Sequence, residues 1–181
     1  MNGPTRTRGA FTRYVAIGDS FTEGMSDADP EHPDRYVGWA DRLAAHLARL
    51  ATEQGKEGQQ SQQDPDFGYA NLAVRGRLLA NIVGPQLEHA ISLEPDLVSI
   101  VGGGNDILRP RADIDALAAR LEDAVSRLRA CGADVLLATP TDPRDAPLIR
   151  ASRGRAATYT DRKSTRLNSS HSEISRMPSS A

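Results

Sequence analysis

A serine that directly follows a short apolar run is the first residue in the chain that could carry covalent chemistry. The run Arg13–Ile17 ends at Gly18, and Ser20 follows within the segment Gly18–Gly24 (GDSFTEG). A serine in that place can project its hydroxyl beyond the end of a strand, and its amide can donate to a developing oxyanion. Taken alone, the segment is more typical of a helix cap. It is not the Gly-x-Ser-x-Gly elbow, because Thr22 stands where the second glycine is required.

Two further groups of glycine and asparagine follow other apolar runs. Asn71–Gly76 (NLAVRG) ends in a glycine whose N–H could reach a substrate oxygen, although a turn glycine is the commoner meaning of that residue alone. Gly102–Asp106 (GGGND) lets the backbone approach a ligand, and Asn105 offers a neutral amide donor suited to an oxyanion of the transition state. A phosphate-binding loop is the alternative for this segment, but neither phosphate-binding glycine motif is present.

Together the three groups contain what acyl transfer requires. Ser20 is the candidate nucleophile, and the candidate oxyanion donors are its own amide, the Gly76 amide and the Asn105 side chain. Asp19 and Asp106 lie beside these residues in the sequence. Their expected role is to support the loops by hydrogen bonds rather than to transfer protons.

The elements that must position these residues are predicted from the spacing of apolar side chains. Short runs rich in apolar residues predict four strands, at Arg13–Ile17, Gly68–Val74, Leu97–Val101 and Val135–Ala138. Helical spacing predicts three helices, at Trp39–Leu50, Pro85–Leu93 and Asp113–Ala130, with polar loops at 19–37 and 52–66. Alternating strands and helices predict an α/β fold with a parallel sheet covered on both faces. In such sheets the ligand lies beyond the carboxyl ends of the strands, where all three polar groups fall.

Composition limits the class of protein. The chain has 181 residues and a formal net charge of −2, so it fits one soluble domain without the basic surface of nucleic-acid-binding proteins. The single cysteine, Cys131, excludes an internal disulfide. The sequence shows neither a signal peptide nor an apolar run of membrane-spanning length, so a cytoplasmic location is expected.

The end of the chain differs in character from the rest, because it is rich in serine and arginine and lacks apolar periodicity. Asp161–His171 and Ser175–Ala181 can both be encoded, in frame and in order, by a common DNA-sequencing adaptor. The native sequence is therefore expected to end near Thr160. We predict a disordered N-terminal arm over residues 1–12, a C-terminally truncated domain over residues 13–160, and a non-native, disordered tail over residues 161–181.

The three polar groups resemble the first conserved blocks of the GDSL/SGNH hydrolases, GDS, N-x-A-x-x-G and G-x-N-D, over the stretch from Tyr14 to Thr139. The resemblance implies a three-layer α/β/α sandwich of the flavodoxin-like type. It also implies that Ser20 is the nucleophile, with Gly76 and Asn105 in the oxyanion hole. Small carboxylic esters would be hydrolysed through an acyl-enzyme, with no metal or organic cofactor.

The family's last block, D-x-x-H, supplies the orienting aspartate and the general-base histidine, and it is not found in this chain. His32 follows Asp29 at that spacing but precedes the other blocks, so we take the match as chance. His46 and His89 fall on predicted helices as surface residues, and His171 lies in the adaptor-like tail. Because serine is a weak nucleophile without a base, the expectation is a serine esterase that lacks its catalytic Asp and His and has little activity.

Two other functions fit parts of the same pattern. A non-catalytic binding protein could keep the fold and a pocket without the base, since fold alone does not determine function. A nucleotide-binding flavodoxin-like protein would need a phosphate motif, which the sequence does not contain. The sequence indicates neither the acyl and alcohol specificity nor the oligomeric state.

Overall fold

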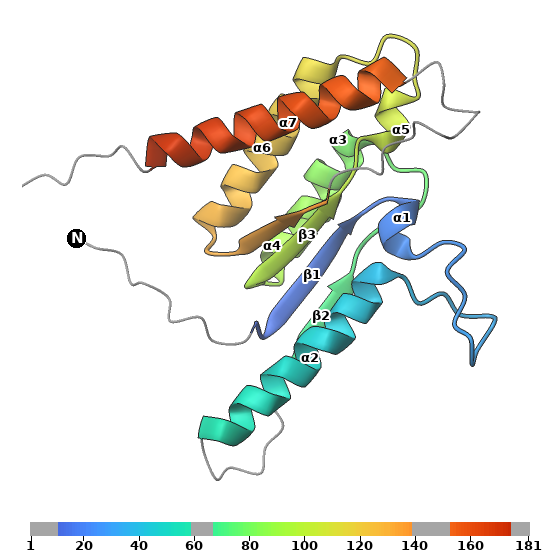
Figure 1. Ribbon diagram of the computed structural model, residues 1–181, viewed down its shortest axis with the longest axis vertical. Helices are drawn as coiled ribbons and strands as arrows, with labels where there is room; N and C mark the ends of the chain where they lie inside the picture. The colour runs from blue at the N-terminus through green and yellow to red at the C-terminus, as the bar shows by residue number, and fades with distance from the viewer. Residues whose placement is uncertain (1–10, 59–66, 139–152, 175–181) are drawn as a thin grey trace, which may run out of the picture.

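Four parallel strands form the sheet at the centre of the protein (Figure 1). The computed structural model describes residues 11–58, 67–138 and 153–174. The strands are β1 (Arg13–Gly18), β2 (Gly68–Asn71), β3 (Leu97–Val101) and β4 (Asp134–Leu137), in the spatial order β2-β1-β3-β4. This order, with the first strand between the second and the third, is that of flavodoxin-like sheets. The predicted fold class is confirmed.

Helices cover both faces of the sheet (Figure 1). Helix α2 (Trp39–Gly58) packs on one face, against Tyr14, Ala16 and Leu97. The helices on the other face are α3 (Leu79–Asn81), the π-helix η1 (Ile82–Gln86), α4 (Leu87–Ser92), α6 (Ile114–Ala130) and α7 (Arg153–Ile174). Two short helices, α1 (Ser20–Glu23) and α5 (Gly104–Ile107), directly follow the carboxyl ends of β1 and β3.

The central strands are buried on both faces because their side chains alternate between two apolar layers. Val15 and Ile17 of β1 enter the layer under α4 and α6, whereas Tyr14 and Ala16 point to the α2 side. The Tyr14 hydroxyl lies 2.7 Å from the Ser99 hydroxyl, and burial raises the pKa of Tyr14 to about 12. This pairing lets two polar groups lie inside the sheet without a desolvation penalty for unpaired atoms.

The outer strand β4 is less covered than the central strands. Leu136 of β4 pairs in register with Ser99 and is 44% exposed.

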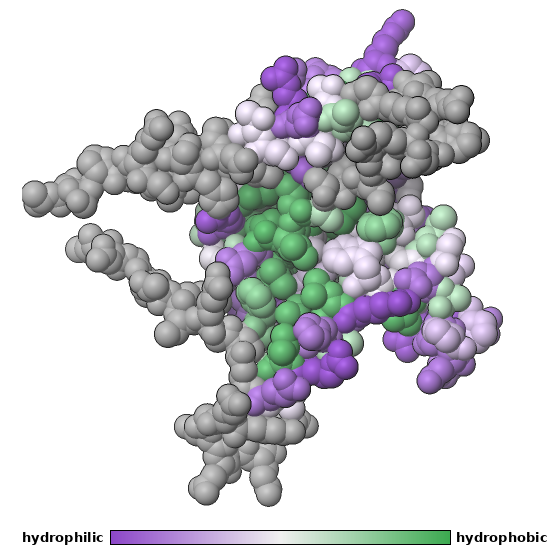
Figure 2. Space-filling model, in the orientation of Figure 1, coloured by the Kyte–Doolittle hydropathy of each residue, from purple (hydrophilic) through white to green (hydrophobic). Residues whose placement is uncertain are grey.

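Hydrophobic residues are visible at the centre of the face shown in Figure 2, with hydrophilic ones above and below them. Within the described ranges, no helix is long and apolar enough to cross a membrane. The expected cytoplasmic location stays a prediction.

Several element boundaries differ from the sequence-based expectation. Strand β2 ends at Asn71 rather than at Val74, and α2 continues to Gly58 through the segment expected to be a loop. A short helix, α1, lies within the expected loop after β1. The third predicted helix is confirmed as α6, with the Asp113 carboxylate accepting a hydrogen bond from the Ala116 amide at 3.0 Å.

The segment predicted at Pro85–Leu93 begins earlier than expected and contains a π-helix. Leu79 starts the helical run, and Pro85 lies inside η1 rather than in a first helical turn. The widened hydrogen-bonding pattern of a π-helix leaves some backbone donors out of the regular ladder, which lets a proline fit there.

The end of the described chain is helical, which differs from the disorder expected after residue 160. Helix α7 runs from Arg153 to Ile174, and Lys163 is buried and donates to the Ala138 carbonyl at 3.0 Å. The first turns of α7 are fixed by Tyr159, which belongs to the main core. Extending a nucleated helix adds one hydrogen bond per residue, so a packed start favours continuation. The domain boundaries at residues 12 and 160 stay a prediction.

Candidate active site

Ser20 is placed at the carboxyl edge of the sheet by a turn between β1 and α1. Asp19 is extended at the N-cap, and its Oδ1 accepts a hydrogen bond from the Phe21 amide at 3.1 Å. Helix α1 stops after one turn at Gly24, which has φ 85°, a left-handed conformation that glycine adopts without strain. Ser20 itself is half-buried, so its hydroxyl is held by a rigid turn next to solvent.

The second sequence group is tied to the first by side-chain hydrogen bonds. The Asn71 amide donates to the Thr22 carbonyl at 2.9 Å, and its oxygen accepts from the Ala73 amide at 3.1 Å. Arg75 forms a bidentate ion pair with Glu23, in which the guanidinium Nε and Nη2 each lie 3.0 Å from a carboxylate oxygen. The loop after β2 is therefore clamped against the helix that carries the serine.

The third sequence group is tied to the second in the same way. The Asn105 amide donates to the Arg77 carbonyl at 2.9 Å, and the Asp106 carboxylate accepts from the Leu79 amide at 2.8 Å. The contact to Arg77 uses one of the two hydrogens on the Asn105 amide nitrogen. Among the described residues, the other hydrogen has no hydrogen-bond partner.

Gly76 lies between these two clamps with an open backbone. Its φ of 74° is left-handed, and a side chain added there would meet no heavy atom within 4 Å. A glycine is required by the backbone conformation rather than by close packing. The structure thus brings the segments of Ser20, Gly76 and Asn105 to one edge of the sheet, while their roles stay a prediction.

Asp19 is the acidic residue that lies deepest at this edge. Burial raises its pKa above the ordinary value of 3.8, the hydrogen bond from Phe21 opposes that rise, and the nearby charge of Asp106 adds to it. The folded protein therefore holds this proton more tightly than the unfolded chain does. The stability that this site contributes falls as the pH rises from 3.8 through the raised pKa.

We therefore expect Asp19→Asn to gain stability relative to the unsubstituted protein as the pH is raised from about 4 to about 7. Asparagine keeps the oxygen that accepts from Phe21 and removes the buried charge. Urea unfolding midpoints at the two pH values measure the difference. Asp34→Asn, at an exposed position, is the matched control and should show no such gain. A pH-independent difference for Asp19→Asn would contradict the assignment.

Gln86 is a site residue that the sequence reasoning missed. Its side-chain oxygen accepts from the Gly18 amide at 2.8 Å, and its side-chain nitrogen donates to the Gly18 carbonyl at 3.0 Å. A side chain added at Gly18 would lie 2.8 Å from the Val101 carbonyl, so the strand end is also packed closely. The side-chain amide of Gln86 thus binds both the N–H and the C=O of Gly18, two residues before Ser20, and the C=O also accepts from the Val74 amide at 3.2 Å.

Replacing Gln86 with leucine is expected to destabilise the protein by about 2 kcal/mol, because the Gly18 amide loses its side-chain acceptor and the Gly18 carbonyl keeps only its bond from the Val74 amide at 3.2 Å. Gln86→Glu keeps an acceptor for the Gly18 amide and loses the donor to its carbonyl, so an intermediate loss is expected. Urea denaturation followed by circular dichroism measures both. Equal stability of the leucine variant and the original protein would show that the amide bridge is dispensable.

Tyr159 is the second residue that was missed, and it lies behind the glycine-rich loop after β3. The side chain is fully buried, and its hydroxyl lies 3.4 Å from the Gly102 carbonyl. A side chain added at Gly103, which has φ 94°, would come within 2.8 Å of the tyrosine ring. Burial raises the pKa of Tyr159, so the phenol stays neutral at ordinary pH. The loop that carries Asn105 is thus backed by an aromatic ring.

In the described part of the chain, His32, His46 and His89 form no hydrogen bond with Ser20, and the side chain of His171 lies outside the described residues. His32 is exposed and lies 3.7 Å from Asp29, while His46 and His89 are exposed on α2 and α4. The predicted surface positions of these two helical residues are confirmed. Over the same described ranges, no group of three or more potential metal-ligating side chains comes together.

Comparison with solved structures gives the same fold. An α/β hydrolase enzyme, LAE5, from the metagenome of Lake Arreo, Spain, matches with a TM-score of 0.62 at 19% identity, over 88% of this chain and 74% of that one. A catalytic mutant of Axe2, an acetylxylan esterase from Geobacillus stearothermophilus, matches with a TM-score of 0.62 at 18% identity, over 90% and 74%. The acetyl xylan esterase AlAXEase matches with a TM-score of 0.55 at 16% identity, over 86% and 74%.

Comparison of sequences identifies the family. A search of curated protein sequences gives no match. The family description "GDSL-like Lipase/Acylhydrolase" matches residues 16–168, which include the segments of Ser20, Gly76 and Asn105 and most of the chain. The chain therefore belongs to the GDSL-like lipase/acylhydrolase family.

Proposed function

We propose that this protein is a serine ester hydrolase that cleaves small carboxylic esters through an acyl-enzyme. The observation that carries the proposal is the set of hydrogen bonds that joins the Ser20, Gly76 and Asn105 segments at one sheet edge. Two independent clamps join the segments of the proposed nucleophile and the proposed oxyanion donors, which supports the preorganisation that acyl transfer needs.

In the proposed reaction, the Ser20 oxygen attacks the ester carbonyl carbon and forms a tetrahedral intermediate. The negative oxygen accepts hydrogen bonds from the Ser20 amide, the Gly76 amide and the remaining hydrogen of the Asn105 side chain. Collapse releases the alcohol, which takes up the proton lost by the serine, and leaves the acyl group on Ser20. Attack by water then releases the acid and restores the serine hydroxyl.

Family membership and fold support this proposal from a second direction. The family is described by its lipase and acylhydrolase activities, and two of the structures with the same fold are acetyl xylan esterases. We extend the class of reaction, hydrolysis of a carboxylic ester, to this chain. No metal or organic cofactor has a part in the proposed reaction.

The proton of the Ser20 hydroxyl needs an acceptor, and His32, His46 and His89, whose side chains are described, form no hydrogen bond with it. We propose that the chain lacks the catalytic Asp and His and that its activity is correspondingly low. The same observation favours the alternative, a non-catalytic binding protein with an SGNH-like fold. In that case the serine would have no special reactivity.

Labelling with a fluorophosphonate probe separates the two functions. Imidazole is added as an external base, and the labelled peptide is identified by mass spectrometry. The esterase proposal expects selective labelling of Ser20 that disappears in Ser20→Ala. Ser126, exposed on α6, serves as an internal control for non-specific reaction. Labelling of Ser20 no faster than that of Ser126 would favour the binding protein.

A further inference from the structure

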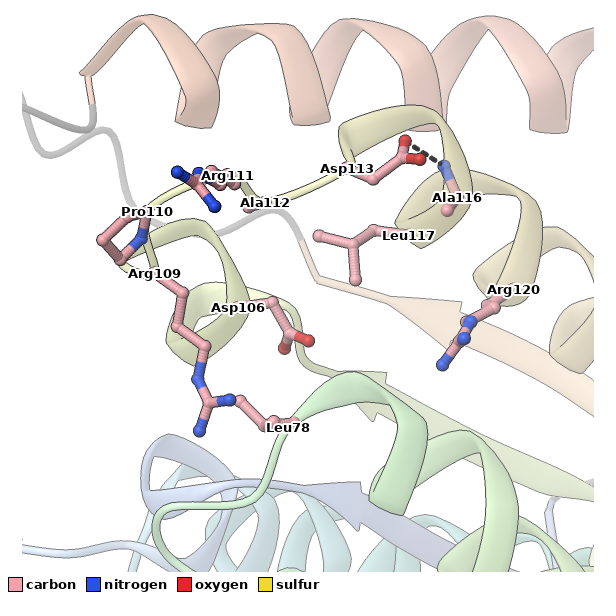
Figure 3. A pocket seen from close by; sticks show the side chains of 10 residues that line it. All are labelled: Leu78, Asp106, Arg109, Pro110, Arg111, Ala112, Asp113, Ala116, Leu117 and Arg120. Carbon is pink, nitrogen blue, oxygen red and sulfur yellow. Dashed lines mark hydrogen bonds between the residues drawn. The ribbon is translucent and has the colours of Figure 1, made fainter.

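A pocket lies beside the segment Gly102–Asp106, on the side where α5 meets the start of α6 (Figure 3). Its volume is about 270 Å³. Leu78, Asp106 and the first turns of α6 line it, and the rest of the wall is the loop from Arg109 to Asp113. The pocket is large enough for a small molecule or for one group of a larger ligand.

Three arginines from different parts of the wall surround this pocket. Figure 3 shows Arg109 extending along one side toward Leu78, Arg120 on the other side from α6, and Arg111 at the rim. Within the described ranges, none of the three makes an ion pair or a side-chain hydrogen bond, unlike Arg75, which pairs with Glu23. Arg111 also has a left-handed backbone, φ 65°, which is uncommon for a residue with a side chain.

The two carboxylates in the wall are already occupied by backbone donors. Asp106 accepts from the Leu79 amide at 2.8 Å, and Asp113 accepts from the Ala116 amide at 3.0 Å. Neither carboxylate is hydrogen-bonded to an arginine of the pocket in the described residues. The wall therefore carries three guanidinium groups against two committed carboxylates, which leaves an excess of positive charge and of free donors.

We propose that this pocket binds a small oxyanion, the carboxylate or phosphate group of a ligand. Arginine presents a planar fork of donors that matches either group with two parallel hydrogen bonds. Two such forks from opposite walls, Arg109 and Arg120, would hold the anion between them, with Arg111 contributing charge at the rim. The site is independent of Ser20 chemistry, because none of its lining residues takes part in the proposed acyl transfer.

The pocket nevertheless shares a wall with the candidate active site. The Arg77 carbonyl accepts a hydrogen bond from Asn105, and the Leu79 amide donates one to Asp106. Leu78, which lies between Arg77 and Leu79, lines the pocket. An anion bound there would lie against the segment that fixes the oxyanion donor Asn105. The anionic group therefore belongs either to a substrate that extends past the ester or to a separate small ligand.

Isothermal titration with three probes tests the proposal on the whole chain at low ionic strength. Inorganic phosphate represents a phosphate ligand, D-glucuronate represents a carboxylate on a sugar, and D-glucose is the neutral control. Binding of either anion without binding of glucose supports the site, and the anion that binds more tightly shows whether the site prefers a phosphate or a carboxylate group. Added salt should weaken that binding, because the attraction is between charges.

Substitutions then assign the binding to the pocket. Arg109→Gln and Arg120→Gln are each expected to weaken anion binding about tenfold. Arg49→Gln, which removes the same charge from an exposed position on α2, should leave it unchanged. Circular dichroism confirms that each variant is folded, and Arg120→Lys, which keeps the charge and loses the fork, should bind with intermediate affinity. Absence of anion binding, or an equal loss in Arg49→Gln, would overturn the proposal.

Discussion

The 181-residue chain is expected to hydrolyse p-nitrophenyl acetate about 10⁴-fold more slowly than a serine esterase with a complete triad. The reason is chemical rather than structural. The turn that holds Ser20 and the clamps to the Gly76 and Asn105 segments are in place, but His32, His46 and His89 form no hydrogen bond with Ser20. A neutral hydroxyl is a poor nucleophile, and the oxyanion donors alone retain only a small part of the rate.

Imidazole in solution should restore part of this activity. The quantity to measure is the release of p-nitrophenol that depends on Ser20, which is the rate of the original protein minus that of Ser20→Ala at each imidazole concentration. This difference is expected to be close to zero without imidazole and to rise with its concentration. A fast burst without imidazole that Ser20→Ala abolishes would show that the chain contains its own base.

Gly103→Ala is expected to destabilise the protein by about 3 kcal/mol. Two costs combine at this position. The backbone has φ 94°, which alanine adopts only with strain, and the new methyl group would lie 2.8 Å from the ring of Tyr159. That ring is fully buried in the main core, so it cannot move aside without opening a cavity.

The neighbouring Gly104→Ala is the matched control for this prediction. A methyl group at Gly104 would meet no heavy atom within 4 Å, and Gly104 does not have a left-handed backbone. Urea unfolding of both variants measures the two costs together. Combining Gly103→Ala with Tyr159→Ala separates them, because removing the ring relieves the contact and leaves the backbone strain. Equal stability of Gly103→Ala and Gly104→Ala would contradict the close packing of the loop against Tyr159.

The elements that were predicted well are those whose signal is local. Strands β1 and β3 are short runs of mainly apolar residues, and all of their residues except Arg13 are buried. Helix α6 has a capping aspartate, an apolar stripe and a closing glycine, each readable from its own sequence. For the same reason the three polar groups could be placed at one edge, since a parallel sheet brings the carboxyl ends of its strands together.

The features that were missed depend on packing rather than on local pattern. The extension of α2 to Gly58 is mostly polar and contains Gly55 and Gly58, so neither hydrophobic periodicity nor helix propensity indicates it. Gln86 and Gly18 are 68 positions apart, and nothing near either residue indicates that they meet. Tyr159 contacts Gly103, which is far from it in the sequence, so the residues next to Tyr159 do not indicate this contact.

The π-helix η1 sets the direction in which Gln86 points. A π-helix is commonly an α-helix with one residue inserted, and the five residues of η1 end at Gln86. Deleting one of the residues before Gln86 would restore the regular α-helix and rotate the glutamine by about 100° relative to Leu79. Its amide would then point away from Gly18. The extra residue in η1 therefore directs the Gln86 amide to the end of β1, two residues before Ser20.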